Sequence, residues 1–382
     1  SKLIFEFSDI LLNLTAKIVS HLSFFHVHIN RHFLNYRSLK IPDYITFSTD
    51  PATSLIDLLK KFNADKVAYL VDENTKAHCL PLFKLDNDPL IIEIKSGELH
   101  KNLDTCQHIW KILTENGFSR KSLLVNIGGG VIGDMGGFAA ATYKRGIRFI
   151  NFPTTLLASV DANIGGKLGI DFNGFKNHIG VFQDPDAVVI CDLFLQTLPE
   201  RELRSGFAEV IKHGLIYDKD YYVKSKSSEF PHLNWLKIIE KSVEIKGDVV
   251  AQDPKEAGLR KILNFGHTIG HGIETWYLNA GKSLLHGEAI SIGMITEGFL
   301  SHKSGYLSDV ELKEMADYLL TIYGRYDLPP IEEVLPLMMQ DKKNNGNEIS
   351  FSLLESIGKC GFDQRIPLNW IEESFVFYQN LK

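Results

Sequence analysis

The sequence has few cysteines, no excess of positive charge and no long apolar run. Its four cysteines, Cys79, Cys106, Cys191 and Cys360, are scattered and form no CxxC pair. This argues against a disulfide scaffold or a cysteine-based zinc site and favours a reducing, cytoplasmic setting. The net charge of −6 gives no global basic field, so we expect no nucleic-acid or membrane-surface partner. No stretch reaches the roughly 18 uncharged apolar residues that a membrane span needs.

The 382 residues, 44% of them hydrophobic, are enough for two domains with sizeable cores. Residues 10–29 are rich in apolar side chains, but Lys17 and three histidines interrupt them and no A-x-A-like cleavage site follows. We therefore reject a signal peptide. We interpret residues 1–43 as an N-terminal extension, and we expect an added helix or a poorly ordered arm there rather than a targeting segment.

The pattern from Tyr44 onward predicts an α/β domain over residues 44–195. Its predicted strands, at 66–75, 89–100, 122–128, 148–153 and 187–192, alternate with helical segments, an order typical of a parallel sheet. After about residue 196 only helical periodicity is evident, so we expect an all-helical second domain over residues 196–382. The cleft between two such domains is a usual place for a small-molecule site, and we expect the active site there.

A glycine-rich turn, GGGVIGD at 128–134, follows a predicted strand and opens a helix. It contains G-x-G-x-x-G, whose glycines let the backbone approach a pyrophosphate at a helix N-terminus. The usual fingerprint has an acid at the end of the next strand, but that strand ends FINFPTT and has none. Asp72, at the end of an earlier strand, is a candidate to bind a ribose. The alternative is a tight strand–helix turn without a ligand.

Several side chains have the chemistry of metal ligands. His267 and His271 are four residues apart, on one helical face, and His286 follows in LLHGE. Glu209 lies in FAEVIKHG, with Lys212 one turn later. Catalytic zinc takes about three histidine or carboxylate ligands, but this spacing does not say which three would bind. The alternative is a pair of surface histidines.

A dispersed set of cations lies in apolar or glycine-rich surroundings, as is typical where phosphate and carboxylate groups are held. The set comprises Arg145, Lys167, Lys176 with its neighbour Asn177, Lys246, Arg260, Lys342 and Lys343. For each one alone, the alternative is a solvated surface charge.

Together these motifs resemble the 3-dehydroquinate synthases, a family within the sugar phosphate cyclases. The resemblance runs from about Tyr44 to the C-terminus, in blocks such as GGGVIGDMGGFAAATYKRG, LPERELRSGFAEVIKHGLI and DPKEAGLRKILNFGHTIGHGIE. The family often reads GGKTGIN where this chain reads GGKLGID, with Leu168 and Asp171. Neither change removes a residue that the resemblance assigns to catalysis.

The resemblance implies roles position by position. The implied zinc (or cobalt) ligands are Glu209, His267 and His286. The implied NAD contacts are Asp72, Asn74, Glu98, Lys101, Gly129, Gly130, Val131, Asp134, Thr154, Thr155 and Asp161. The implied substrate contacts are Lys167, Asn177, Lys212, Lys246, Arg260, Asn264, His271 and one of Lys342 and Lys343. Arg145 matches an arginine that reaches a phosphate site across the interface of a homodimer.

The family reaction implied is the conversion of 3-deoxy-D-arabino-heptulosonate 7-phosphate into 3-dehydroquinate and phosphate, a step of aromatic amino acid biosynthesis. NAD transiently oxidises a hydroxyl beside the metal, phosphate leaves by β-elimination, the hydride returns, and an intramolecular aldol step closes the carbocycle. His271 and Asn264 are candidates to relay protons. The alternatives are a cyclase acting on sedoheptulose 7-phosphate or glucose 6-phosphate, an NAD- and metal-dependent polyol dehydrogenase, and a non-catalytic nucleotide-binding module.

Overall fold

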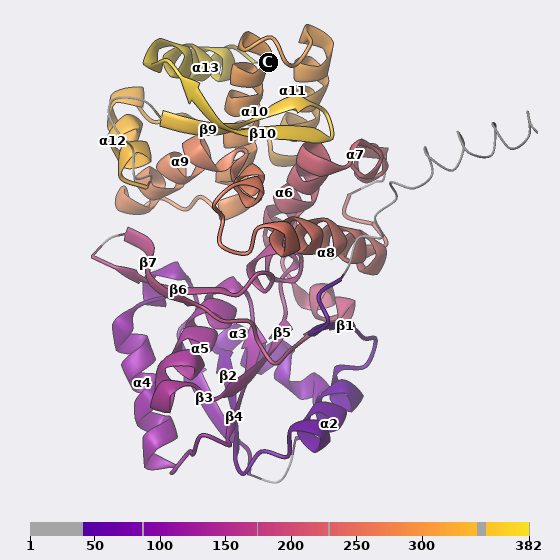
Figure 1. Cartoon of the computed structure of the whole chain (residues 1–382), viewed down its shortest axis with the longest axis vertical. Coiled ribbons are helices and arrows are strands. Elements are labelled where there is room, and N and C mark those ends of the chain that lie inside the picture. Colours follow the sequence, from indigo (N-terminus) through magenta and orange to yellow (C-terminus); the bar gives the residue numbers. More distant parts are fainter. Residues whose placement is uncertain (1–40, 86–87, 174, 228–229, 342–348, 382) are drawn as a thin grey trace, which may run out of the picture. The chain divides into compact units, whose positions relative to one another are not determined.

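The computed structural model describes residues 41–85, 88–173, 175–227, 230–341 and 349–381. The chain from Ile41 onward forms one compact unit. In Figure 1 its sheet layer lies below its helical layer. Most of the predicted N-terminal extension, residues 1–40, and both candidate lysines Lys342 and Lys343 lie outside the described residues. Within the described part, no helix is long and apolar enough to cross a membrane.

Six parallel strands form the main sheet, in the order β1-β8-β5-β4-β2-β3. These strands are β1 (Ile45–Phe47), β2 (Val67–Asp72), β3 (Leu90–Ile94), β4 (Leu123–Gly128), β5 (Arg148–Pro153) and β8 (Ala187–Ile190). The central strand β4, LLVNIG, is buried at every position because both faces of the sheet are covered. The predicted parallel sheet is confirmed; only the three-residue β1 was not predicted.

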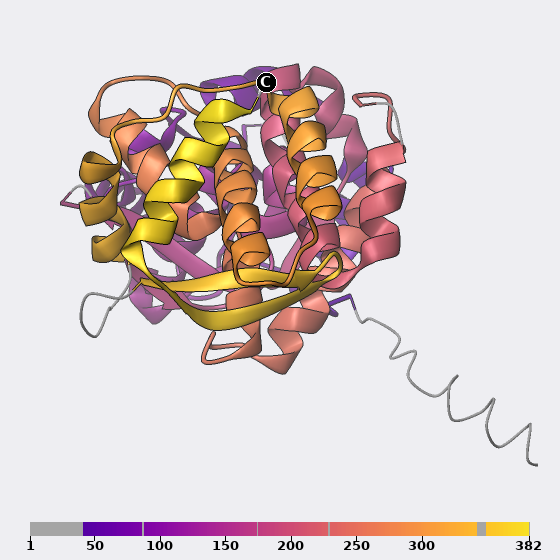
Figure 2. The ribbon, with the colours of Figure 1, turned by 90° about the horizontal axis from the view of Figure 1, so that it is seen from above.

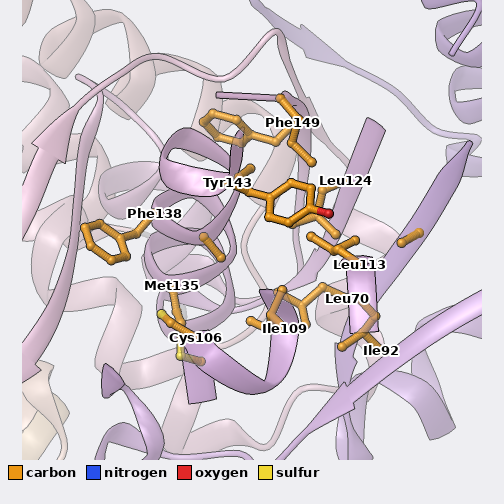
Figure 3. Close-up of a cluster of buried hydrophobic side chains, with 14 of the residues drawn as sticks. Leu70, Ile92, Cys106, Ile109, Leu113, Leu124, Met135, Phe138, Tyr143 and Phe149 are labelled. Carbon is orange, nitrogen blue, oxygen red and sulfur yellow. The ribbon is translucent and has the colours of Figure 1, made fainter. Parts of the chain in front are cut away.

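Helices and short turns connect these strands and cover the sheet. They are α2 (Pro51–Phe62), α3 (Glu73–His78), α4 (Leu103–Glu115) and α5 (Gly130–Thr142), with the turns η1 (Leu80–Leu82), η2 (Glu98–His100), η3 (Tyr143–Arg145), η4 (Ala158–Ala162) and η5 (Asp192–Thr197). Figure 3 shows one core cluster, in which Leu70 and Leu124 of the strands meet Ile109 of α4 and Met135 of α5. A second cluster packs Leu55 of α2 against the other face.

A two-stranded hairpin, β6 (Lys167–Phe172) with β7 (Phe175–Phe182), follows η4 and was not predicted. Leu168 and Ile170 belong to the core cluster of the sheet layer, whereas Lys167, on the opposite face of the strand, is exposed. Side chains of a strand alternate between its faces, and here Gly169, on the face of Lys167, is buried as well. The hairpin places Lys167 and Lys176 where they contact Glu256 and Glu274 of the helical layer, whereas Asn177 contacts Lys101 of the sheet layer.

The second layer is mainly helical, as predicted. It consists of α6 (Glu200–Tyr217), α7 (Lys219–Ser227), α8 (Trp235–Gln252), η6 (Leu259–Asn264), α9 (His267–Asn279), α10 (His286–Lys303), α11 (Asp309–Tyr323), α12 (Ile331–Asp341) and α13 (Leu368–Asn380). Helix α10 is central, since it packs against α6, α9, α11 and α13. It is accordingly buried along most of its length.

The expectation that this layer contains only helices was wrong. Strands β9 (Ile349–Ser356) and β10 (Lys359–Ile366) pair as an antiparallel hairpin, which Figure 2 shows in yellow along one side of the helices. Its first residues, ISFS, alternate between apolar residues and serines, which is a strand pattern, although Ser352 is buried as well as Ile349 and Phe351. The alternation is too short to stand out in a region of otherwise helical periodicity.

Candidate active site

Three side chains from three helices converge in the helical layer. Glu209 lies on α6, His267 is the first residue of α9, and His286 is the first residue of α10. One ligand atom of each lies within 4.8 Å of the others. The Glu209 Oε1 atom is 3.5 Å from Nε2 of His267 and 3.6 Å from Nε2 of His286. Among the described residues, this buried oxygen has no hydrogen-bond partner. A buried unpaired carboxylate oxygen facing two imidazoles fits a divalent metal such as zinc.

The start of α9 fixes the orientation of His267. Glu297, buried on α10, accepts hydrogen bonds from the backbone N–H groups of Gly266 (2.6 Å) and Ile269 (2.9 Å), and so satisfies donors at this helix N-terminus. The His267 Nδ1 atom lies 3.1 Å from the Phe265 carbonyl oxygen, to which Nδ1–H donates. The Nε2 atom is thereby left to face Glu209, as a metal ligand must.

In the sequence HGE at the start of α10, the glycine and the glutamate each have a structural reason. Glu288 binds Arg201 through two hydrogen bonds of 2.6 and 2.7 Å, which anchors the first turn to α6. A Cβ atom at Gly287 would lie 2.0 Å from the Ser205 carbonyl oxygen, so only glycine allows this approach. Ser205 Oγ accepts from the Gly287 N–H at 3.0 Å. His286 is thus held one residue away from a close contact between two helices.

Electrostatics give the three candidate ligands different protonation states. Burial acts to raise the pKa of Glu209, but the Lys212 ammonium beside it and His267 outweigh burial and hold that pKa well below its ordinary value. Burial and Lys212 hold the pKa of His267 well below its ordinary value. For His286, burial is outweighed by Glu274 and Glu209, which raise its pKa to about 9. Glu209 is therefore ionised and His267 neutral near pH 7, whereas His286 must lose a proton to become a ligand.

The glycine-rich turn lies at the carboxyl end of β4, where α5 begins. Gly129 is the N-cap of α5 and provides no side-chain cap, so the first N–H groups of the helix are not occupied by it. A Cβ atom at Gly129 would lie 3.0 Å from Cγ2 of Thr155, and the Thr154 N–H donates to the Gly128 carbonyl oxygen at 3.0 Å. A bare glycine backbone at a helix N-terminus fits the pyrophosphate of a dinucleotide.

The other predicted NAD contacts come from several elements of the sheet layer. Asp72 ends β2, the strand beside β4, and its carboxylate also caps α3 by accepting from the Thr75 N–H at 2.7 Å. The buried Lys101 binds Asp134 of α5 (2.5 Å) and Asn177 of the β6–β7 hairpin (2.6 Å). A predicted NAD residue thus contacts a predicted substrate residue.

Three further predicted NAD contacts also lie in the sheet layer. Asn74, on α3, is exposed, and Glu98, on η2, is half-buried. Val131 lies in the first turn of α5.

Asp161 lies in η4, a π-helical turn, and meets Lys246 of α8. The Lys246 Nζ atom is 2.5 Å from Asp161 Oδ1 and 2.7 Å from the Asp161 carbonyl oxygen. Burial acts to raise the pKa of Asp161, but the Lys246 ammonium outweighs it and lowers that pKa to about 2. Single π-helical turns are rare and often occur at functional sites. The predicted NAD and substrate residues are therefore again in direct contact.

A second contact between the layers involves a residue that sequence analysis missed. Glu256 forms an ion pair with Lys167 of β6 and accepts from Asn264 Nδ2 at 2.7 Å. Burial acts to raise the pKa of Glu256, but Lys167 outweighs it, so the carboxyl pKa lies below its ordinary value. Arg260, 2% exposed, donates to the carbonyl oxygens of Pro254 (2.7 Å) and Gly165 (3.2 Å). Glu256 occurs in the block EAGLRK, where its position four residues before Arg260 was the available signal.

His271 lies beside the two candidate histidine ligands, whereas Arg145 lies away from the other site residues of its own chain. His271 lies one turn after His267, with its ring centroid 5.0 Å from that of His267 and 5.8 Å from that of His286. Arg145 is exposed at the other end of α5 from the glycine-rich turn. The 13 residues of α5 span roughly 20 Å, so Arg145 does not join the other site residues of its own chain. Lys342 and Lys343 lie outside the described residues.

Comparison with known families decides which group of proteins this site belongs to. The model of the 3-dehydroquinate synthase N-terminal region matches residues 91–205, and that of the C-terminal region matches residues 206–344. The chain belongs to the 3-dehydroquinate synthase family. The 3-dehydroquinate synthase of Parabacteroides distasonis is 41% identical over 345 residues, which cover 88% of this chain and 97% of that protein. The resemblance inferred from the sequence is confirmed.

Solved structures show that this member of the 3-dehydroquinate synthase family has a fold shared more widely. A 2-deoxy-scyllo-inosose synthase, complexed with carbaglucose-6-phosphate, NAD+ and Co2+, is similar at a TM-score of 0.75 with 23% identity, over 87% of this chain and 95% of that one. A 2-epi-5-epi-valiolone synthase from Streptomyces hygroscopicus subsp. jinggangensis, with NAD+ and Zn2+ bound, also gives 0.75 and 23%, over 90% and 99%. At this identity the likeness shows the fold alone.

Proposed function

We propose that the protein converts 3-deoxy-D-arabino-heptulosonate 7-phosphate into 3-dehydroquinate and phosphate, as a carbon–oxygen lyase. The observation that supports this most strongly is the pairing of a candidate metal-ligand set, whose carboxylate is buried, with a buried cation. Lys212 contacts the same Glu209 carboxylate that faces His267 and His286. An anionic substrate bound beside the metal needs such a cation, and the 41% identity to a 3-dehydroquinate synthase fits the same activity.

The proposed cofactors are NAD and a zinc or cobalt ion. We infer that residues 44–195 hold NAD, through the glycine-rich turn and Asp72, and that residues 196–382 hold the metal, through Glu209, His267 and His286. When bound, NAD accepts and returns a hydride, and the metal ion acts as a Lewis acid on a substrate oxygen.

The protein's own side chains would bind the two anionic groups of the substrate and move its protons. Lys212, Lys246 and Arg260 are each buried, and in a buried site a cation binds a carboxylate or phosphate more strongly than at the surface. Lys167 and Asn177 approach from the β6–β7 hairpin. His271, adjacent to both candidate histidine ligands, is placed to hold or transfer a proton. Asn264, which donates a hydrogen bond to Glu256, would orient neighbouring groups, because its amide does not ionise near neutral pH.

The proposal includes a homodimer in which Arg145 binds phosphate in the partner's site. Two features support it. The length of α5, roughly 20 Å, separates Arg145 from the glycine-rich turn of its own chain. Lys144 and Arg145 also both have positive φ values, 51° and 69°, a conformation that L-residues with side chains adopt at a cost. Such a turn, followed by Gly146, fixes the arginine on the outside of the sheet layer.

The competing assignments are cyclases whose substrates, sedoheptulose 7-phosphate and glucose 6-phosphate, have no carboxylate. The test is to incubate the purified protein with NAD and Zn2+ and each of the three sugar phosphates in turn, and to measure released phosphate and identify the product by mass spectrometry. We expect phosphate and a carbocyclic acid only from the heptulosonate phosphate. Turnover of either of the other two substrates alone would overturn the assignment.

A further inference from the structure

His286 lies between two carboxylates, one on each side of its imidazole ring. Its Nε2 atom faces Glu209 Oε1 at 3.6 Å, and its Nδ1 atom faces Glu274 Oε2 at 3.5 Å. Glu274 lies on α9, two helical turns after His267, and is 8% exposed. The ring therefore presents one nitrogen to the candidate metal position and the other to a buried acid.

We propose that Glu274 is a positioning residue of the metal site, which holds His286 with Nδ1–H directed at α9 and Nε2 directed at Glu209. Histidine ligands generally donate their second ring N–H to a carboxylate or carbonyl group, which fixes the tautomer and orientation of the ring. His267 already follows this rule through the Phe265 carbonyl oxygen. Glu274 is the corresponding acceptor for His286. The inference rests on the proposed function, because it requires that the site binds a metal.

The orientation of Glu274 depends in turn on the sheet layer. Lys176 of β7 lies 2.8 Å from Glu274 Oε1 and 3.8 Å from Glu98 Oε1. The carboxylate thus has one oxygen on Lys176 and the other toward His286. Because a buried carboxylate is costly without a cation, Lys176 both stabilises Glu274 and limits its rotation.

Lys176 is next to Asn177 in the sequence, so its ion pair with Glu274 lies beside a second group of polar contacts. Asn177 accepts from Lys101 at 2.6 Å, and Lys101 also binds Asp134 of α5 at 2.5 Å. Of these neighbouring residues of one strand, Lys176 contacts the acid behind His286 directly, and Asn177 is linked through Lys101 to the helix that the glycine-rich turn opens. It follows that loss of Lys176 weakens metal binding although Lys176 is not itself a ligand.

The test compares Glu274→Gln, Lys176→Met and the double variant with the wild-type protein after loading with Co2+. The measurements are the Co2+ dissociation constant, by competition with a chelator, and the visible ligand-field spectrum. Glu333→Gln is a matched control, because Glu333 of α12 also contacts α9, through Trp276 Nε1 at 2.6 Å. Circular dichroism of the metal-free proteins reports folding separately.

We expect Glu274→Gln to weaken Co2+ binding on the order of tenfold to a hundredfold and to alter the spectrum. Lys176→Met should weaken binding less, the double variant should be no worse than Glu274→Gln, and Glu333→Gln should match wild type. Wild-type affinity and spectrum in a folded Glu274→Gln protein would overturn the inference. If that variant does not fold, unchanged Co2+ binding by Lys176→Met would overturn it. Failure of the wild-type protein to bind Co2+ would instead refute the proposed metal site itself, and this inference with it.

Discussion

Lys246 of α8 donates to Asp161 of the π-helical turn η4, with Nζ 2.5 Å from the carboxylate and 2.7 Å from the backbone carbonyl oxygen. This single side chain links the helical layer to the turn that follows β5. Because Asp161 is a candidate NAD contact and Lys246 a candidate substrate contact, the pair orders the two halves of the proposed site relative to each other.

The pair should contribute to stability as a unit. Lys246→Ala leaves the Asp161 carboxylate without its main cation, and we expect a loss of about 1–3 kcal/mol in the free energy of unfolding. Lys246→Ala combined with Asp161→Asn should cost less than the sum of the two single changes, because each single change leaves one charge unpaired whereas the double variant leaves none. Urea unfolding of the wild type, the two single variants and the double variant gives the four free energies of unfolding to be compared. Additive losses would show that the two side chains do not interact appreciably.

Metal content should depend on each of the three candidate ligands. His286→Ala should lower zinc affinity by more than the roughly 10–100-fold that is typical when only a supporting residue is changed. His302→Ala provides a control on the same helix α10, since this half-buried histidine contacts the Leu307 carbonyl oxygen instead. Equilibrium dialysis with elemental analysis gives the affinities. Full metal content and activity in His286→Ala would refute the ligand assignment.

Subunit mixing should show whether Arg145 acts in its partner. Arg145→Ala and Lys246→Ala homodimers should each be nearly inactive. When they are unfolded and refolded together, about half of the dimers are mixed, and each mixed dimer has one intact site and one site with both defects. Roughly a quarter of wild-type activity should return. If mass spectrometry confirms mixed dimers and no activity returns, Arg145 does not act across the interface.

High pH should destabilise the protein in part through Tyr44. Burial raises the pKa of Tyr44 from 10.0 to about 12, and its hydroxyl oxygen accepts from the Gly165 N–H at 3.2 Å. Because the folded-state pKa lies above the unfolded-state value, this contribution is fully present below pH 10 and is lost as the pH rises toward 12.

Tyr44→Phe should therefore show a shallower fall in the free energy of unfolding between pH 10 and pH 12 than wild type. Tyr306→Phe, at an exposed tyrosine, should keep the wild-type slope. Chemical unfolding at several pH values provides the comparison. Equal slopes for Tyr44→Phe and wild type would show that ionisation of Tyr44 is not coupled to unfolding.

Local patterns made part of this molecule predictable from its sequence. The glycine-rich turn follows β4 and opens α5, and its residues are close in sequence. His267 and His271 are adjacent in space because they are one turn apart on a single helix. The alternation of strands with helices in the first half was enough to predict a parallel sheet.

Tertiary contacts account for what the sequence did not predict. Lys176 and Glu274 are 98 positions apart, so no local pattern connects them. Glu297 is a buried acid on α10 whose only visible sequence context is apolar, and its partners are backbone N–H groups of α9. The hairpin β6–β7 has no regular alternation of apolar and polar residues along both strands, and its Lys167 and Asn177 suggested ligand binding rather than secondary structure.

The stoichiometry of NAD tests the central claim most directly. In the proposed reaction NAD is reduced and reoxidised within each cycle, so it is required but not consumed. Protein freed of nucleotide should be inactive without NAD. With NAD well below the heptulosonate phosphate concentration, we expect many phosphates released per NAD and no steady rise in NADH absorbance at 340 nm. NADH accumulating in step with product, at one NAD per turnover, would contradict the account and indicate a dehydrogenase instead.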